Sequence, residues 1–113
     1  MRQDDDARLR HMLDAAMDAA GFADGRTRAD LDSDRMLVLA IVKCIEIIGE
    51  AASKVSAAGR ERAASLPWAD IIAMRHRLIH AYYDVDLDVV WNTVAVDLPA
   101  LIGGLRDAFR QEP

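Results

Sequence analysis

The stretch Arg75-His76-Arg77-Leu78-Ile79-His80-Ala81-Tyr82-Tyr83 decides how the rest of the chain is interpreted. It holds two of the three histidines, both tyrosines and two arginines inside a pattern of apolar residues at helical spacing. Charged groups within such a pattern need a partner or an opening to solvent, because burying a lone charge costs several kcal/mol. We therefore expect the remaining helices to hold this stretch in place.

Length and composition predict one domain over residues 1–113, built as a helical bundle. Hydrophobic residues make up 52% of the 113 residues but aromatic residues only 5%, so Ala, Leu, Ile and Val dominate. The net charge of −5 argues against non-specific binding to nucleic acid, which needs a basic surface. This net charge is compatible with a small basic patch on part of the surface.

Three features favour a cytoplasmic protein without a membrane segment. The single cysteine, Cys44, rules out an internal disulfide, and its apolar neighbours suggest a buried small side chain. The charged N-terminus does not resemble a signal peptide. The most apolar run, residues 36–42, is too short to cross a bilayer.

Helical spacing of apolar residues predicts four main helices joined by short connections. The first covers residues 5–20, with Gly21 as a stop signal, and the second covers residues 34–57. The third covers residues 67–82, and the fourth begins after Asp86 and breaks near Asp97-Leu98, just before Pro99. The fold is therefore predicted to be all-α, an antiparallel four-helix bundle with room for a fifth, short helix.

The second helix is the longest and the most apolar, so we expect it to be central. Two adjacent apolar stripes leave only a narrow polar face that includes Lys43, Glu46 and Glu50. A helix of this kind is buried from two sides, by other helices, by a second copy of the chain, or by both. Gly49 costs about 1 kcal/mol relative to Ala inside a helix, which suggests the close approach of another helix.

A helical wheel places Arg75 at the centre of the apolar face of the third helix, in line with Tyr82. An ion pair with Glu46 or Glu50 would satisfy that charge. His76, His80 and Tyr83 form a neighbouring line on the helix. On an ideal helix, about 140° separates the direction of Arg75 from that of His80. The two side chains would converge only at a groove between subunits or where the helix unwinds.

Arginine and histidine without a metal suit the cleavage of a phosphodiester. Histidine titrates near neutrality and can move protons at a 2′-hydroxyl or a leaving oxygen, while arginine holds the phosphate. His76 and His80 have zinc-binding spacing, but a third ligand is not evident and Arg77 would oppose the metal. We therefore expect no cofactor.

The segment Arg75-x4-His80-x-Tyr82 resembles the R-x4-H-x-Y motif of HepT-like proteins in the HEPN superfamily. His76 fits the polar residue that this superfamily favours after the arginine. The similarity extends to residues 45–52, to Pro67-Trp68 and to residues 85–91 and 97–99. The resemblance thus covers most of the chain.

The resemblance implies a toxin of a type II toxin–antitoxin pair that acts as a metal-independent endoribonuclease. Arg75 and His80 would be catalytic, with His76 in support, in a cleft at a homodimer interface. The partner would be a minimal nucleotidyltransferase antitoxin, which can transfer AMP to Tyr82. Two alternatives stay open: a non-catalytic nucleotide- or partner-binding module, and a structural dimerisation domain.

Overall fold

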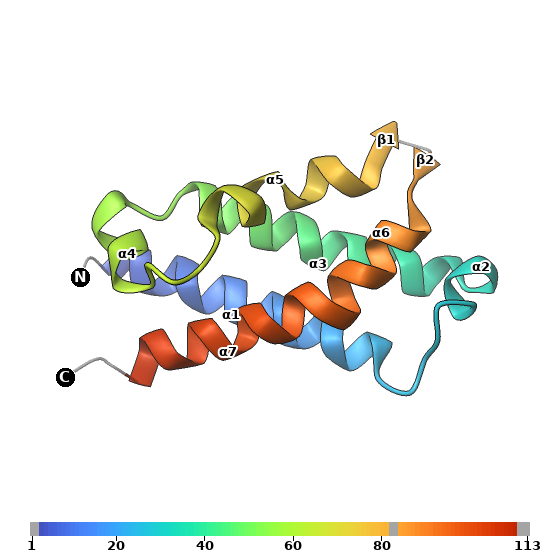
Figure 1. The fold of residues 1–113 in the computed structure, drawn as a ribbon, viewed down its shortest axis with the longest axis horizontal. Coiled ribbons are helices and arrows are strands. Elements are labelled where there is room, and N and C mark those ends of the chain that lie inside the picture. Colours follow the sequence, from blue (N-terminus) through green and yellow to red (C-terminus); the bar gives the residue numbers. More distant parts are fainter. Residues whose placement is uncertain (1–2, 82–83, 111–113) are drawn as a thin grey trace.

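Helices account for most of residues 3–81 and 84–110, which are the residues that the computed structural model describes (Figure 1). The long helices are α1 (Gln3–Ala23), α3 (Arg35–Ser53) and α5 (Trp68–Leu78). A fourth long segment joins α6 (Leu87–Asn92), a π-helical stretch η1 (Thr93–Asp97) and α7 (Leu98–Arg110). The predicted all-α bundle of four long helical segments is confirmed, and the homodimer stays a prediction.

Short elements fill the connections between the long helices. Helix α2 (Asp30–Ser33) precedes α3, and helix α4 (Ala57–Arg62) lies between α3 and α5. Strands β1 (Ile79–Ala81) and β2 (Asp84–Val85) pair antiparallel as a small hairpin after α5. The sequence did not predict this hairpin, and of the short helices α2 and α4 in the connections it allowed for only one.

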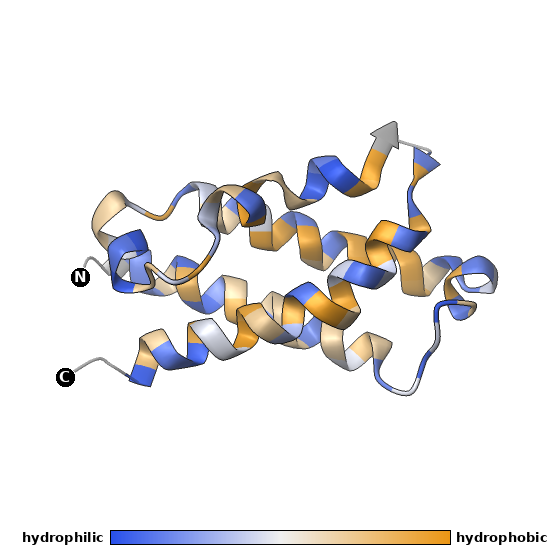
Figure 2. Cartoon of the chain, viewed as in Figure 1, coloured by the Kyte–Doolittle hydropathy of each residue, from blue (hydrophilic) through white to orange (hydrophobic). Residues whose placement is uncertain are grey.

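The core lies where α1 and α3 pack along each other, with α5 covering α3 and α7 covering α1. Figure 2 shows apolar residues concentrated along α3 and in α6 and α7, whereas the segment around α2 is mostly hydrophilic. Fully buried side chains come from all four long segments: Leu9, Met12, Ile41, Ile45, Ile48, Leu78, Leu98 and Leu105. Helix α3 contributes most to the core, which confirms the central position predicted for it.

Helix α3 starts and packs as its sequence indicates. The side chain of Asp34 accepts a hydrogen bond from the Leu37 amide at 3.1 Å, and so caps the first turn. Gly49 faces α5: a Cβ atom there would lie 3.5 Å from the carbonyl oxygen of Ile72. The predicted close approach of another helix is confirmed, and Cys44 is buried as expected.

The N-terminal turn of α1 is fastened to the start of α4. Asp5 is buried and accepts hydrogen bonds from the Ser56 amide, at 2.9 Å, and from the Ser56 hydroxyl. A Cβ on Gly59 would come within 2.9 Å of the Asp5 carboxylate, so only glycine fits there without a shift. At its other end α1 continues past Gly21 to Ala23, so the predicted stop at Gly21 was wrong.

The last helical segment changes its geometry but stays continuous where the sequence predicts a break. Asp86 caps α6 by accepting a hydrogen bond from the Val89 amide at 3.2 Å. Pro99 has no amide hydrogen, and the turn before it widens into the π-helical stretch η1 instead of breaking.

The combined stretch Leu87–Arg110 is long and apolar enough to cross a membrane by length and composition. A core helix of a bundle meets the same criterion, and Leu98, Leu101 and Leu105 are buried in this core. The stretch is therefore weak evidence for a membrane helix.

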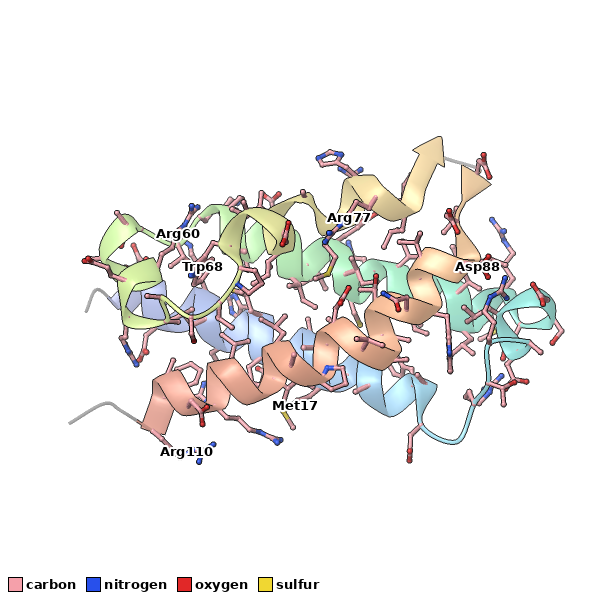
Figure 3. All side chains as sticks on the ribbon, viewed as in Figure 1. Met17, Arg60, Trp68, Arg77, Asp88 and Arg110 are labelled. Carbon is pink, nitrogen blue, oxygen red and sulfur yellow. The ribbon has the colours of Figure 1, made fainter. Side chains whose placement is uncertain are left out.

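Side-chain contacts outside the core hold the short elements in place (Figure 3). The guanidinium group of Arg60 lies 5.6 Å from the centre of the Trp68 ring, and the ring nitrogen donates to the Ala63 carbonyl at 3.1 Å. At the other end of the bundle, Nε of Arg28 lies 2.7 Å from a carboxylate oxygen of Asp88. These contacts dock α4 on α5 and the α1–α2 connection on α6.

Candidate functional site

Helix α5 ends at Leu78, four residues before the predicted end at Tyr82. Ile79 has an extended backbone, with φ −113° and ψ 110°, and begins β1. The amide of Asp86 then donates to the Leu78 carbonyl at 2.7 Å, which ties the return strand to the helix end. Arg75 is therefore on the last helical turn, and the backbone of His80 is in the hairpin.

Arg75 lies on the rim of α5 and not at the centre of its buried face. The buried side chains of α5 are Ile71, Met74 and Leu78, and Arg75 is 53% exposed. The wheel placed Arg75 wrongly because it gave no weight to Met74, which fills the core instead. The predicted partner is confirmed: Nε of Arg75 lies 3.6 Å from a carboxylate oxygen of Glu46.

The end of α5 carries a cluster of positive charge. Arg75, His76 and Arg77 occupy its last turn, where cations are favoured by the partial negative charge of a helix C-terminus. His76 is exposed to solvent, next to Arg75 in the chain. Arg77 donates to the Asp70 carbonyl at 2.9 Å and so turns back along its own helix.

The remaining predicted site residues follow directly after this cluster. The side chain of His80 and all of Tyr82 and Tyr83 lie outside the described residues. Because the helix ends at Leu78, the predicted separation of about 140° between Arg75 and His80 does not apply. The chain unwinds between them, which is one of the two ways in which the sequence allowed them to converge.

No metal-ligand cluster accompanies these residues in the described part of the chain. Groups of three or more His, Cys, Asp or Glu side chains at metal-binding distance are not found among residues 3–81 and 84–110. The described side chains next to Arg75 include the Glu46 carboxylate and the exposed His76.

A groove of about 590 Å³ opens beside Arg75, between α1, α3 and α5. It is lined by side chains of both charges and by three apolar residues: Asp4, Ala7, Arg8, His11, Lys43, Glu46, Ile47, Glu50, Ala51, Lys54 and Arg75. The third histidine, His11, thus shares a groove with the motif arginine. No signal in the sequence predicts this, because the relative register of α1 and α3 cannot be determined from either helix alone.

A family model for ribonuclease HepT-like proteins matches residues 12–107 of the chain. A candidate RNase of Caldanaerobacter subterraneus subsp. tengcongensis is 31% identical over 104 residues, which cover 92% of this chain and 93% of that protein. The probable ribonuclease HepT of Thermococcus cleftensis is 38% identical over 74 residues, 66% of this chain and 67% of its own. No solved structure is significantly similar to the chain.

Proposed function

Because the chain belongs to the ribonuclease HepT-like family, we propose that it is an endoribonuclease that cleaves RNA with Arg75 and His80. The observation that carries the proposal is the placement of Arg75. Its guanidinium group is half exposed on the rim of a groove, one helical turn from the hairpin that contains the His80 backbone. A similarity that spans most of the chain supports the same activity.

Arg75 is available to a phosphate. Its contact with Glu46, at 3.6 Å, is an ion pair longer than a normal hydrogen bond, and both side chains are partly exposed. Such pairs contribute little to stability, so a substrate phosphate can replace the carboxylate at low cost. Arginine then binds the phosphate through two parallel N–H groups and stabilises the negative charge that develops during cleavage.

His80 supplies the proton transfer in this proposal. A histidine with an ordinary pKa changes charge near neutral pH, so it can take the proton of the 2′-hydroxyl or give one to the leaving oxygen. His76, exposed beside Arg75, supports phosphate binding. The 2′-oxygen bonds to phosphorus as the bond from phosphorus to the leaving 5′-oxygen breaks, so the products are a 2′,3′-cyclic phosphate and a 5′-hydroxyl, and no cofactor is needed.

A homodimer completes the site in the same proposal. Three large apolar side chains are exposed where the C-terminal end of α1 meets the N-terminal end of α3: Phe22 at 46%, Met36 at 82% and Leu39 at 51%. This is also the end of the bundle at which the β1–β2 hairpin lies (Figure 1). A second copy that covers these side chains would bring two hairpins together around one cleft.

Ribonuclease assays with single-site variants test the catalytic proposal. Purified wild type should cleave single-stranded RNA in the presence of EDTA, whereas Arg75→Ala and His80→Ala should not. Thermal unfolding must show the same Tm for all three proteins. Equal cleavage by wild type and His80→Ala would rule out the assigned role of His80.

The proposed biological role is that of a toxin held in check by a minimal nucleotidyltransferase antitoxin. The antitoxin would join the Tyr82 phenolic oxygen to the α-phosphate of ATP, with release of pyrophosphate and the phenolic proton. Co-expression with a nucleotidyltransferase encoded beside this chain, followed by intact-mass measurement, tests the role. AMP-sized additions should disappear in Tyr82→Phe and persist in Tyr83→Phe; additions that survive Tyr82→Phe would exclude Tyr82 as the acceptor.

A second candidate function is a non-catalytic module that binds a nucleotide or a partner protein. The net charge of −5 favours it, because an acidic protein repels RNA at long range. It predicts tight association with the nucleotidyltransferase, no cleavage by the purified protein, and no growth arrest when the chain is expressed alone.

A further inference from the structure

We propose that the groove between α1, α3 and α5 binds the RNA strand next to the cleaved phosphate. Lys43 and Lys54 contact phosphates, and Ile47 provides the surface for a base. The assignment rests on the proposed ribonuclease function, and it adds a substrate-binding surface outside the Arg75–His80 motif.

The charge of the groove differs from that of the whole chain. Four Lys or Arg side chains, three carboxylates and one histidine line it, in a protein whose net charge is −5. The groove therefore carries one more positive than negative charge, in contrast to the acidic molecule as a whole. Phosphate contacts of this kind give affinity without sequence readout, and the acidic remainder limits binding elsewhere on the surface.

Two of the three carboxylates in the groove are engaged, and cationic groups remain available to a ligand. Glu46 faces Arg75, and Glu50 lies 3.0 Å from the ammonium group of Lys54 in an exposed i,i+4 pair on α3. Lys43 has no carboxylate partner within residues 3–81 and 84–110. A phosphate could therefore bind Lys43 directly and displace Glu50 from Lys54 at low cost.

Between these charges the groove has an apolar floor. Ile47 is 39% exposed on α3, and Ala7 and Ala51 flank it from α1 and α3. His11 lies beside this floor, and its imidazole ring can stack on a nucleobase. Single-stranded nucleic acids bind surfaces that combine charged rims with apolar or aromatic floors in this way.

The groove also runs past the proposed catalytic residues. Helix α5 is antiparallel to α3, because Gly49 faces Ile72 whereas Glu46 faces Arg75. The groove therefore extends along α3 from Lys43, on the hairpin side of Glu46, to Lys54 at the far end, over about 16 Å at 1.5 Å per residue. An RNA strand bound along it would present one of its phosphates to Arg75, which faces Glu46 between the two lysines, next to the hairpin that contains His80.

RNA binding by the catalytically silent His80→Ala protein tests the proposal. Lys43→Ala and Lys54→Ala are combined in that background, and binding to a short single-stranded RNA is measured over a range of salt concentrations. The control combines Arg106→Ala with Arg110→Ala, which removes the same charge from α7 outside the groove. The slope of log K against log salt should fall by about 1.4 for the groove variant, as expected for two lost phosphate contacts, and stay unchanged for the control.

The same two double variants, with His80 intact, separate binding from chemistry. The groove variant should raise KM by about tenfold with kcat unchanged, and the control should change neither. Ile47→Ala should raise KM, whereas Val96→Ala, an exposed apolar residue outside the groove, should not. Unchanged Tm values show that all variants fold.

Several results would overturn the assignment. Equal loss of RNA affinity in the groove variant and the control would mean that only net charge matters. If the groove substitutions dissociate a dimer in size-exclusion chromatography, the groove is a subunit interface. If wild type fails to cleave RNA but binds it in a groove-dependent manner, the ribonuclease proposal falls and the binding site stands.

Discussion

Replacing Glu46 by glutamine should make the enzyme bind RNA more tightly. Nε of Arg75 lies 3.6 Å from the Glu46 carboxylate, and the two side chains are 53% and 35% exposed. Exposed pairs of this kind contribute about 0.2–1 kcal/mol. A phosphate must offset that energy before it binds Arg75, and about 1.4 kcal/mol corresponds to a factor of ten in affinity. We expect KM to fall up to about fivefold in Glu46→Gln, with kcat unchanged.

The assay is the initial rate of cleavage of a single-stranded RNA at low and at physiological salt. The change in KM should shrink as salt increases, because ions screen the exposed carboxylate. Glu61→Gln is the matched control: it removes the same charge from α4, outside the groove. The Tm of Glu46→Gln should stay within a few degrees of wild type, since so little energy is lost.

An increase in KM or a loss of kcat in Glu46→Gln would refute this reasoning. Either result would mean that the carboxylate positions Arg75 for the substrate instead of competing with it. An unchanged KM would show that the pair does not limit phosphate binding. Equal changes in KM in Glu46→Gln and Glu61→Gln would mean that the lower net negative charge of the protein alone explains the tighter binding.

Three further predictions concern stability and reactivity. Gly49→Ala should leave the free energy of unfolding unchanged or raise it by up to about 1 kcal/mol, because its Cβ would only touch the Ile72 carbonyl. Gly49→Leu should lower the free energy of unfolding, and urea unfolding measures both variants. The hydrogen bond from the Arg26 guanidinium lowers the pKa of Asp34 below its ordinary value of 3.8. The stability that this carboxylate contributes is therefore fully present above about pH 4, and it is lost as the pH falls through the lowered pKa. Asp34→Asn should therefore flatten Tm against pH in acid while lowering Tm at pH 7. Burial raises the pKa of the Cys44 thiol, so a thiol reagent at neutral pH should modify it only at the rate at which the protein opens.

Local signals predicted the helix starts that the structure confirms. Asp34 and Asp86 both precede apolar periodic runs, and both side chains accept a hydrogen bond from an amide three residues later. Gly49 predicted the close approach of another helix, and the structure identifies that helix as α5. Each of these predictions rests on residues close together in the chain.

The end of α5 could not be predicted in this way. Apolar residues continue at helical spacing through Leu78, Ile79 and Tyr82, and no glycine or proline marks a stop. The chain leaves the helix because Ile79 pairs with Val85 in the hairpin, a tertiary contact that outweighs local propensity. The predicted helix over residues 67–82 was wrong for this reason.

The candidate site was predicted in part for similar reasons. The pairing of Arg75 with Glu46 followed from the few carboxylates on the polar face of the second helix. The groove with His11 and Lys43 depends on how α1 and α3 align, and the apolar stripes of two helices permit several alignments. The roles of His76, His80 and Tyr82 stay predictions.

The packing of α7 along α1 has a consequence for synthesis on the ribosome. Leu98, Leu101 and Leu105 belong to the same core as Leu9 and Met12 at the start of the chain. The β1–β2 hairpin is translated before these residues emerge, so the core is still incomplete when residues 75–85 have been made. Chains that stop short of α7 would leave that core unfilled, and we expect ribonuclease activity only in chains that have been translated through α7.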